Sequence, residues 1–124
     1  MPDSSPYGGT VRDHFRRPRN QGPMPDATAS AEGVNPLCGD RVRVALKLDG
    51  NGTITDARFV ANACAICVAS ASLLTERVRG SSREVAAALS DEDIFRLIEE
   101  PVPVARRRCA TLPLEALRRA LASQ

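Results

Sequence analysis

The sequence predicts an α+β fold, with a small antiparallel sheet near the middle of the chain and helices packed on one face of it. Residues 42–48 alternate between apolar and mostly polar side chains, the period-two pattern of a half-buried strand. Residues 49–52, Asp-Gly-Asn-Gly, are a strong hairpin signal, and residues 54–60 predict the returning strand. Helical patterns follow from about residue 65. Strands followed by helices are typical of an α+β domain.

The first third of the chain is less regular. Residues 7–17 predict a short helix with Val11 and Phe15 on one face, and the following proline ends it. Residues 18–37 are rich in proline. We expect a loop-rich passage there, with a short edge strand near residues 27–32.

Four helices are predicted after the hairpin. The first runs from about residue 65 to residue 79 and is closed by Gly80. Two serines, each with an acid three residues later, resemble capping boxes and predict short helices at roughly 83–89 and 91–99. The two pairs are Ser81 with Glu84 and Ser90 with Asp93. After a proline-containing break, a last helix has three leucines on one face, Leu114, Leu117 and Leu121.

Composition narrows the class of protein. The 124 residues suit one domain, so we expect residues 1–124 to form a single unit, and an apolar content of 43% indicates a globular chain. A net charge of +2 is too small to indicate a nucleic-acid partner. The sequence has no apolar run long enough to span a bilayer, and its N-terminus lacks the features of a signal peptide. We therefore expect a cytoplasmic protein without a membrane partner.

The four cysteines are the main functional signal. In the cytoplasm thiols stay reduced, which favours metal binding or reactive sulfur over disulfides, although buried structural cysteines are also common. Cys38 and Asp40 are two positions apart in an extended segment, so their side chains share one side. Cys64 follows the returning strand of the hairpin. Since Cys38 and Cys64 lie at similar distances from the hairpin turn, we expect them at the same end of the sheet.

Cys109 adds a third thiol at the start of the last helix, where backbone N–H groups favour a thiolate. Three thiolates and the Asp40 carboxylate give the right number of ligands for a tetrahedral metal site, which the C-terminal helix would complete. With Zn²⁺ such a site carries a charge of −2, so it needs nearby cations or water. Arg41 and Arg108 are the candidate cations. The alternative for the run at 106–108 is an ordinary solvated basic surface.

Two other residues have less specific patterns. Cys67 shares a helical stripe with three apolar residues, Ala71, Leu74 and Val78. We expect a buried thiol without a direct role, the alternative being an auxiliary sulfur carrier or metal ligand. His14 is the only histidine, and because it is distant from the cysteines in sequence we expect a structural or surface residue.

Three segments, in order, resemble the signature segments of the U-type iron–sulfur assembly proteins, the family of IscU, SufU and the NifU N-terminal domain. They are NPLCGDR at 35–41, ACAICVASAS at 63–72 and RCATL at 108–112. Residues 7–20 fit the family too, so the resemblance covers nearly the whole chain. It implies an α+β domain with a three-stranded sheet, and a site for Zn²⁺ or a transient [2Fe–2S] cluster. It also implies a SufS- or IscS-like cysteine desulfurase and acceptor apo-proteins as partners.

The subtype leaves two functions open. CGDR, CATL and Arg108 resemble the SUF-type member, which implies a zinc-dependent sulfurtransferase with Cys38 as the persulfide acceptor. However, the stretch between Cys64 and Cys109 lacks the insertion usual in that type, and Ala63 replaces the usual glycine. The alternative is a non-enzymatic scaffold on which a [2Fe–2S] cluster is assembled and transferred to apo-proteins. In that case Cys109 would be the first sulfur acceptor.

Overall fold

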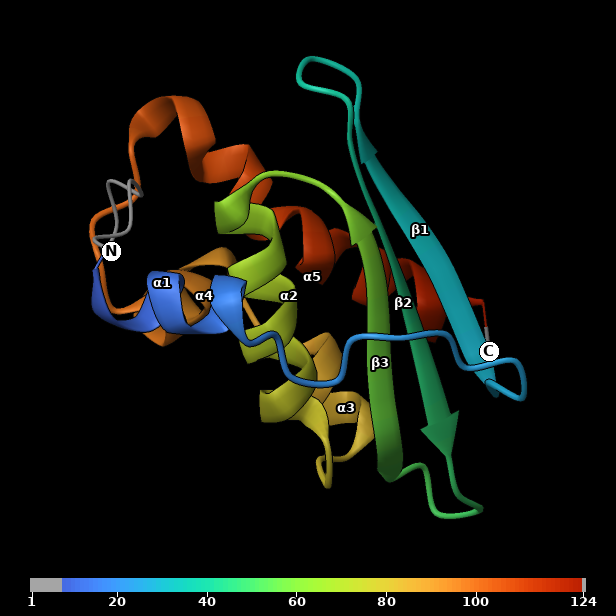
Figure 1. Cartoon of the computed structure of the whole chain (residues 1–124). Coiled ribbons are helices and arrows are strands. Elements are labelled where there is room, and N and C mark those ends of the chain that lie inside the picture. Colours follow the sequence, from blue (N-terminus) through green and yellow to red (C-terminus); the bar gives the residue numbers. More distant parts are fainter. Residues whose placement is uncertain (1–7, 124) are drawn as a thin grey trace.

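The structure, a computed structural model, describes residues 8–123 (Figure 1). Its three-stranded antiparallel sheet has the order β1-β2-β3, with the strands Ala29–Asn35, Asp40–Leu48 and Ile54–Asn62. The helices lie on one face of this sheet, and α5 (Arg107–Ala122) packs directly against β1 and β2. The predicted α+β class, the small sheet and the one-sided helical layer are confirmed.

The predicted hairpin is formed by β2 and β3. Its core-facing side chains on β2 are fully buried against the helices, and these are Val42, Val44 and Leu46. The turn is held by the Asp49 carboxylate, whose Oδ1 accepts the N–H groups of Asn51 and Thr53, both at 2.9 Å. Gly52 has a φ of +78°, a conformation that favours glycine. The hairpin thus follows from local sequence alone.

The predicted edge strand is present as β1, which pairs with β2 so that Asn35 lies opposite Asp40. A tight turn joins the two strands. In it, the N–H of Gly39 donates to the Asn35 carbonyl at 2.8 Å, and the N–H of Leu37 donates to Asn35 Oδ1 at 3.2 Å. Gly39 has a φ of +76°, which a residue with a side chain rarely adopts. The turn presents Cys38 at the end of the sheet.

The helices follow the predicted order. They are α1 (Gly9–Arg16), α2 (Ala65–Val78), α3 (Arg83–Ala87), α4 (Asp91–Ile98), a 3-10 turn at Val104–Arg106, and α5. The capping box of Ser90 and Asp93 is present, and Gly80 follows the end of α2 with a φ of +83°. Among residues 8–123, no helix combines the length and the apolar character needed to cross a membrane.

The centre of the helical layer is α2, which contacts α1, α4, α5 and β3. Because neighbours surround it, eleven of its fourteen residues are buried. Cys67 is fully buried on this helix, as its place on the apolar stripe predicts.

The predicted apolar face of the first helix is wrong in one residue. Val11 is fully buried, but Phe15 keeps 44% of its surface exposed, and His14 lies on the buried face instead. The imidazole of His14 compensates for its burial with a 2.7 Å hydrogen bond between Nδ1 and the Ser72 hydroxyl on α2. His14 is therefore structural, in line with expectation. The predicted first residue of this helix, Tyr7, lies outside the described residues.

The predicted cap of the third helix is also wrong. Ser82, not Ser81, is the N-cap of α3, and its hydroxyl accepts the N–H of Val85 at 3.1 Å. The Ser81 hydroxyl is engaged elsewhere, because it accepts an N–H of the Arg77 side chain at 3.1 Å. The helix begins at residue 83, as predicted, but ends at Ala87.

Candidate metal centre

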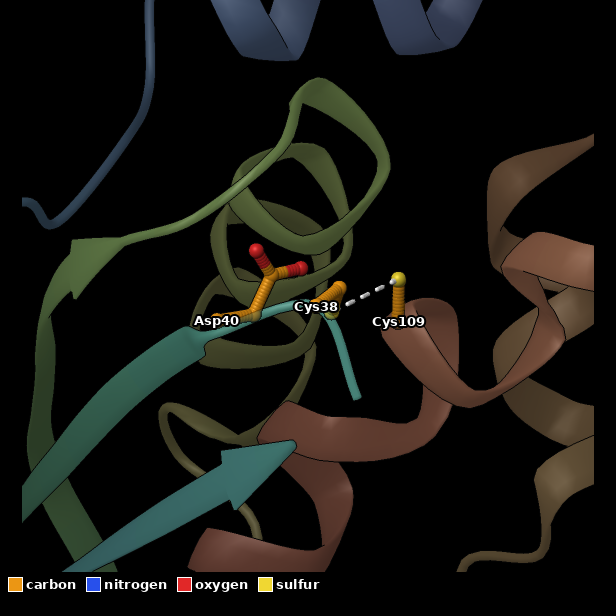
Figure 2. Close-up of side chains that lie close together, drawn as sticks. All are labelled: Cys38, Asp40 and Cys109. Carbon is orange, nitrogen blue, oxygen red and sulfur yellow. Dashed lines mark hydrogen bonds between the residues drawn. The ribbon is translucent and has the colours of Figure 1, made fainter. Parts of the chain in front are cut away.

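Three of the predicted site residues meet at one end of the sheet. Cys38 comes from the turn between β1 and β2, Asp40 from the first position of β2, and Cys109 from the first turn of α5 (Figure 2). One ligand atom of each, two Sγ atoms and a carboxylate oxygen, lies within 4.8 Å of the others. The Sγ atoms of Cys38 and Cys109 are 3.9 Å apart. This spacing allows all three residues to contact one ion.

The site has an open side and a buried side. Cys38 is exposed, whereas Cys109 is 1% and Asp40 is 6% exposed. A partner molecule can therefore reach Cys38 directly. The other two residues are buried.

Asp40 uses its two carboxylate oxygens differently. Oδ1 accepts the backbone N–H of Cys64 at 3.2 Å. Oδ2 is buried and has no hydrogen-bond partner among residues 8–123. Leaving a buried polar atom unpaired costs on the order of 1–3 kcal/mol, more for a charged group. A bound cation would remove this cost, so the Oδ2 atom fits the role of a metal ligand.

Cys64 lies beside this group but is not one of the three converging ligands. It is the N-cap residue of α2 and is half-buried, and its backbone holds the Asp40 carboxylate. Its thiol lies close enough to Cys109 to perturb the pKa of that residue. The assignment of Cys64 as a fourth ligand stays a prediction.

Burial dominates the ionisation of the inner thiols. It raises the pKa of Cys109 to about 12, with further contributions from the Cys64, Asp40 and Cys38 side chains. Burial also raises the pKa of Cys67 well above its usual value. Both groups are therefore neutral thiols near pH 7 when no cation is bound. A metal ion at the centre would supply the positive charge that stabilises the Cys109 thiolate.

Two residues that sequence reasoning missed hold Cys109 in place. The Ser70 hydroxyl on α2 donates a 2.5 Å hydrogen bond to the carbonyl of Ala110 in the first turn of α5. Gly33 on β1 lets α5 come close, because a Cβ there would lie 3.1 Å from the Leu112 carbonyl oxygen. An isolated serine or glycine has no distinctive sequence pattern, so only the fold reveals these roles.

The predicted cations lie on the exposed surface. Arg41 forms an ion pair with Glu32 at 3.6 Å, and Arg108 is exposed on the first turn of α5. The guanidinium carbon of Arg107 lies 5.2 Å from the centre of the Phe95 ring, a cation–π contact. The proposed role of Arg41 and Arg108 in offsetting the negative charge of the metal centre stays a prediction.

Fold and site together define a small α+β protein with a thiol and carboxylate centre that can hold a metal ion. Residues 6–123 match the family model of the NifU-like N-terminal domain. The chain belongs to this family, as the three signature segments indicate.

Two relatives of similar length have different names. The chain is 37% identical over 120 residues to the iron–sulfur cluster assembly scaffold protein IscU of Haemophilus influenzae, covering 94% of this chain and 93% of that protein. It is 34% identical over 135 residues to the zinc-dependent sulfurtransferase SufU of Bacillus subtilis, covering 95% and 90%. The second alignment is longer than the 124-residue chain, so SufU carries residues that this chain lacks.

A longer relative and a solved structure are also similar to this chain. The bifunctional protein NifU/MnmA of Rubrobacter xylanophilus is 38% identical over 114 residues, which cover 92% of this chain but only 23% of that protein. A crystal structure described as a SUF-system scaffold protein from Fervidobacterium islandicum has a TM-score of 0.80 at 24% identity. It covers 93% of this chain and 96% of its own, and it confirms the fold.

Proposed function

We propose that this chain is an iron–sulfur cluster assembly protein that binds Zn²⁺ and accepts persulfide sulfur from a cysteine desulfurase. The main observation is an exposed Cys38 thiol beside a buried thiol and a buried carboxylate oxygen that has no partner among the described residues. The similarity to SufU and IscU relatives supports the assignment.

The donor atoms at the centre suit zinc. Cys38, Asp40 and Cys109 would bind the ion, and Cys64 is the proposed fourth ligand. Three sulfurs and one oxygen match the tetrahedral preference of Zn²⁺, which when bound keeps thiols deprotonated at neutral pH. Because a carboxylate is a harder ligand than a thiolate, Asp40 should make the site more exchangeable than one with four cysteines.

In the proposed reaction, Cys38 is the residue that accepts sulfur. Its thiolate attacks the outer sulfur of the persulfide on the desulfurase cysteine and forms a new S–S bond. The sulfur–sulfur bond of the donor breaks, and its electron pair leaves with the desulfurase cysteine as a thiolate. The proton of the donor persulfide stays with the transferred sulfur. This reaction needs no external oxidant or reductant.

The exposed turn suits Cys38 for this role. The Gly39 and Asn35 backbone bond closes a short turn outside the sheet, so Cys38 can move without breaking strand pairing. Cys109 is part of a helix packed against α2 and β1. We therefore expect sulfur to arrive on Cys38 first.

A second candidate function is a scaffold that assembles a [2Fe–2S] cluster and passes it to apo-proteins. It is favoured by the similarity to IscU and by the shorter length relative to SufU. The same thiols would bind the cluster as cargo.

All four cysteines are free thiols. A reducing compartment such as the cytoplasm keeps thiols in this state, so we propose a cytoplasmic location for either function.

The test is a brief incubation with a SufS- or IscS-like desulfurase and L-cysteine, followed by mass spectrometry of proteolytic fragments. The variants are Cys38→Ser and Cys109→Ser, with Cys67→Ser as the matched control. Iron, zinc and acid-labile sulfide are measured in the anaerobically isolated protein.

For the sulfurtransferase we expect near-stoichiometric zinc and a first added sulfur on Cys38 that only Cys38→Ser abolishes. Iron and sulfide in equal amounts, with the first sulfur on Cys109, would support the scaffold instead. The absence of both metals and of any added sulfur would overturn the proposed function.

A further inference from the structure

The segment between α1 and β1 crosses the face of the sheet that the helices leave uncovered (Figure 1). One end is fixed to β3, where the Asn20 carbonyl accepts the N–H of Phe59 at 3.0 Å and the N–H of Gly22 donates to the Phe59 carbonyl at 2.9 Å. The other end is fixed to β2, where the N–H of Thr28 donates to the Leu46 carbonyl at 2.8 Å. The segment thus spans the sheet between two fixed ends.

Between these ends the segment lies above the sheet without pairing as a strand. Pro23 and Pro25 have no N–H to donate, so the chain cannot continue the strand hydrogen bonds here. The side chain below is Ala45, one of the smallest available. These features leave a cavity of about 350 Å³, within the size range of small-molecule sites.

The cavity has a mixed lining of apolar residues and two cations. Ala45, Val60 and Met24 provide apolar surface, and Arg43 and Arg58 line it as well. Ala45 is five residues along β2 from Asp40, so the cavity lies about 17 Å from the metal centre. It is a separate feature of the molecule.

Arg43 differs from the other cations on this face. Lys47 pairs with Asp26 at 2.6 Å, and Arg58 and Arg41 also have carboxylate partners. Within residues 8–123, Arg43 forms no ion pair, and the one hydrogen bond of its guanidinium goes to the Ser30 hydroxyl at 2.8 Å. Most of the five N–H donors of its guanidinium are therefore available to an anion.

We propose that this cavity binds a small organic monocarboxylate with an apolar body, held by Arg43 and assisted by Arg58. A guanidinium offers two parallel N–H donors that match a carboxylate. The apolar body would lie over Ala45 beneath Met24. At ~30 Å³ per water-sized group, the cavity accommodates roughly ten non-hydrogen atoms.

Met24 provides a direct probe, because the only other methionine is Met1. The zinc-loaded full chain, labelled with ¹³C on the methionine methyl groups, is titrated with benzoate and hexanoate. Benzamide and hexanamide serve as uncharged counterparts of similar shape. The readout is the methyl shift of Met24, which requires neither sulfur transfer nor a desulfurase, so it is independent of the proposed function.

Three variants examine the cavity. Arg43→Gln removes the available guanidinium. Ala45→Val adds two carbons to the floor of the cavity and narrows it, with a residue that suits a strand. Arg96→Gln, the matched control, removes the same charge from α4 on the other side of the sheet. Unfolding curves of each variant confirm that the fold is retained.

We expect saturable shifts with the two carboxylates and weak or no shifts with the amides. Arg43→Gln should weaken binding about tenfold or more, since hydrogen bonds to charged groups are the stronger ones. Ala45→Val should weaken binding, most strongly for the bulkier benzoate, and Arg96→Gln should leave it unchanged. Equal binding of the amides, an unaffected Arg43→Gln variant, or no shift at all would overturn the proposal. So would a tetraglutamate peptide that binds where the small carboxylates do not, since this would indicate a protein-docking surface.

Discussion

Replacing Ser70 with alanine should loosen the part of α5 that carries Cys109. Ser70 is 1% exposed, and its hydroxyl bonds to the carbonyl of Ala110. Pro113 makes this bond more important. It lies inside α5 and has no N–H, so the carbonyl four residues earlier, on Cys109, has no helical donor. The first turn of α5 therefore depends on contacts from outside the helix.

The expected loss of stability can be worked out from this contact. One buried hydroxyl-to-carbonyl bond contributes about 1 kcal/mol net, or roughly a fivefold change in the folding equilibrium. Removing a single oxygen leaves no sizeable cavity, and a carbonyl inside a helix also accepts a backbone N–H. The loss should therefore stay near 1 kcal/mol, and the melting temperature should fall by roughly 3–5 °C for a chain of this size.

Ser123→Ala is the matched control. The Ser123 hydroxyl also donates to a carbonyl of α5, that of Ala120 at 2.9 Å, but at the exposed end of the helix. Urea unfolding gives the stability of both variants. Alkylation with iodoacetamide, mapped by mass spectrometry, compares the reactivity of Cys109 with that of Cys38.

In Ser70→Ala we expect the stability loss above and faster alkylation of Cys109 relative to Cys38. Ser123→Ala should change stability by only a few tenths of a kcal/mol and leave the alkylation ratio unaltered. If the two variants behaved alike in both assays, Ser70 would not be what positions Cys109.

Three further predictions concern other residues. Cys67→Ser should retain most persulfide loading. It should lose roughly 1–3 kcal/mol of stability, because the serine hydroxyl would be buried. Loss of persulfide loading with zinc still bound would contradict the assignment of Cys67 as a residue without a direct role. Burial and the nearby Arg19 lower the pKa of His14 below 6.5. As the pH falls, His14 is therefore protonated in the unfolded chain before it is protonated in the folded chain. Stability should therefore fall as the pH drops below about 6.5, and urea unfolding from pH 8 to pH 5 should show no such slope in His14→Gln. Arg107→Glu should slow association with a desulfurase at low salt while zinc stays bound, and unchanged association kinetics would make this arginine an ordinary surface residue.

The parts of the fold that could be predicted are those with a local cause. The β2–β3 hairpin follows from strand alternation and the Asp49 turn, and α4 from the capping box at Ser90. Phe15 was assigned to the buried face because hydrophobicity alone favours it, but His14 lies there instead. The deciding contact, the Ser72 hydroxyl, lies 58 residues away. Since the Ser72 oxygen accepts the N–H of Arg19, it can donate its own proton to Nδ1 of a neutral His14.

The site could be predicted as far as residue order and hairpin geometry determine it. Residue order and hairpin geometry together place Cys38, Asp40 and Cys64 at one end of the sheet. The structure places them at that end as well. The position of Cys109 depends on how α5 packs, which Ser70 and Gly33 set through contacts distant in sequence. No periodic pattern indicates those contacts.

The structure gives a physical reason for an aspartate, rather than another cysteine, two residues after Cys38. A thiolate has one sulfur, so a backbone N–H and a metal ion would have to share the same atom. A carboxylate has two oxygens, and in Asp40 one of them accepts the N–H of Cys64 at the start of α2 while the other is buried and available. Asp40 thereby joins the beginning of β2 to the beginning of α2 and keeps one oxygen for a ligand. Its role in the fold and its proposed role at the metal centre are complementary.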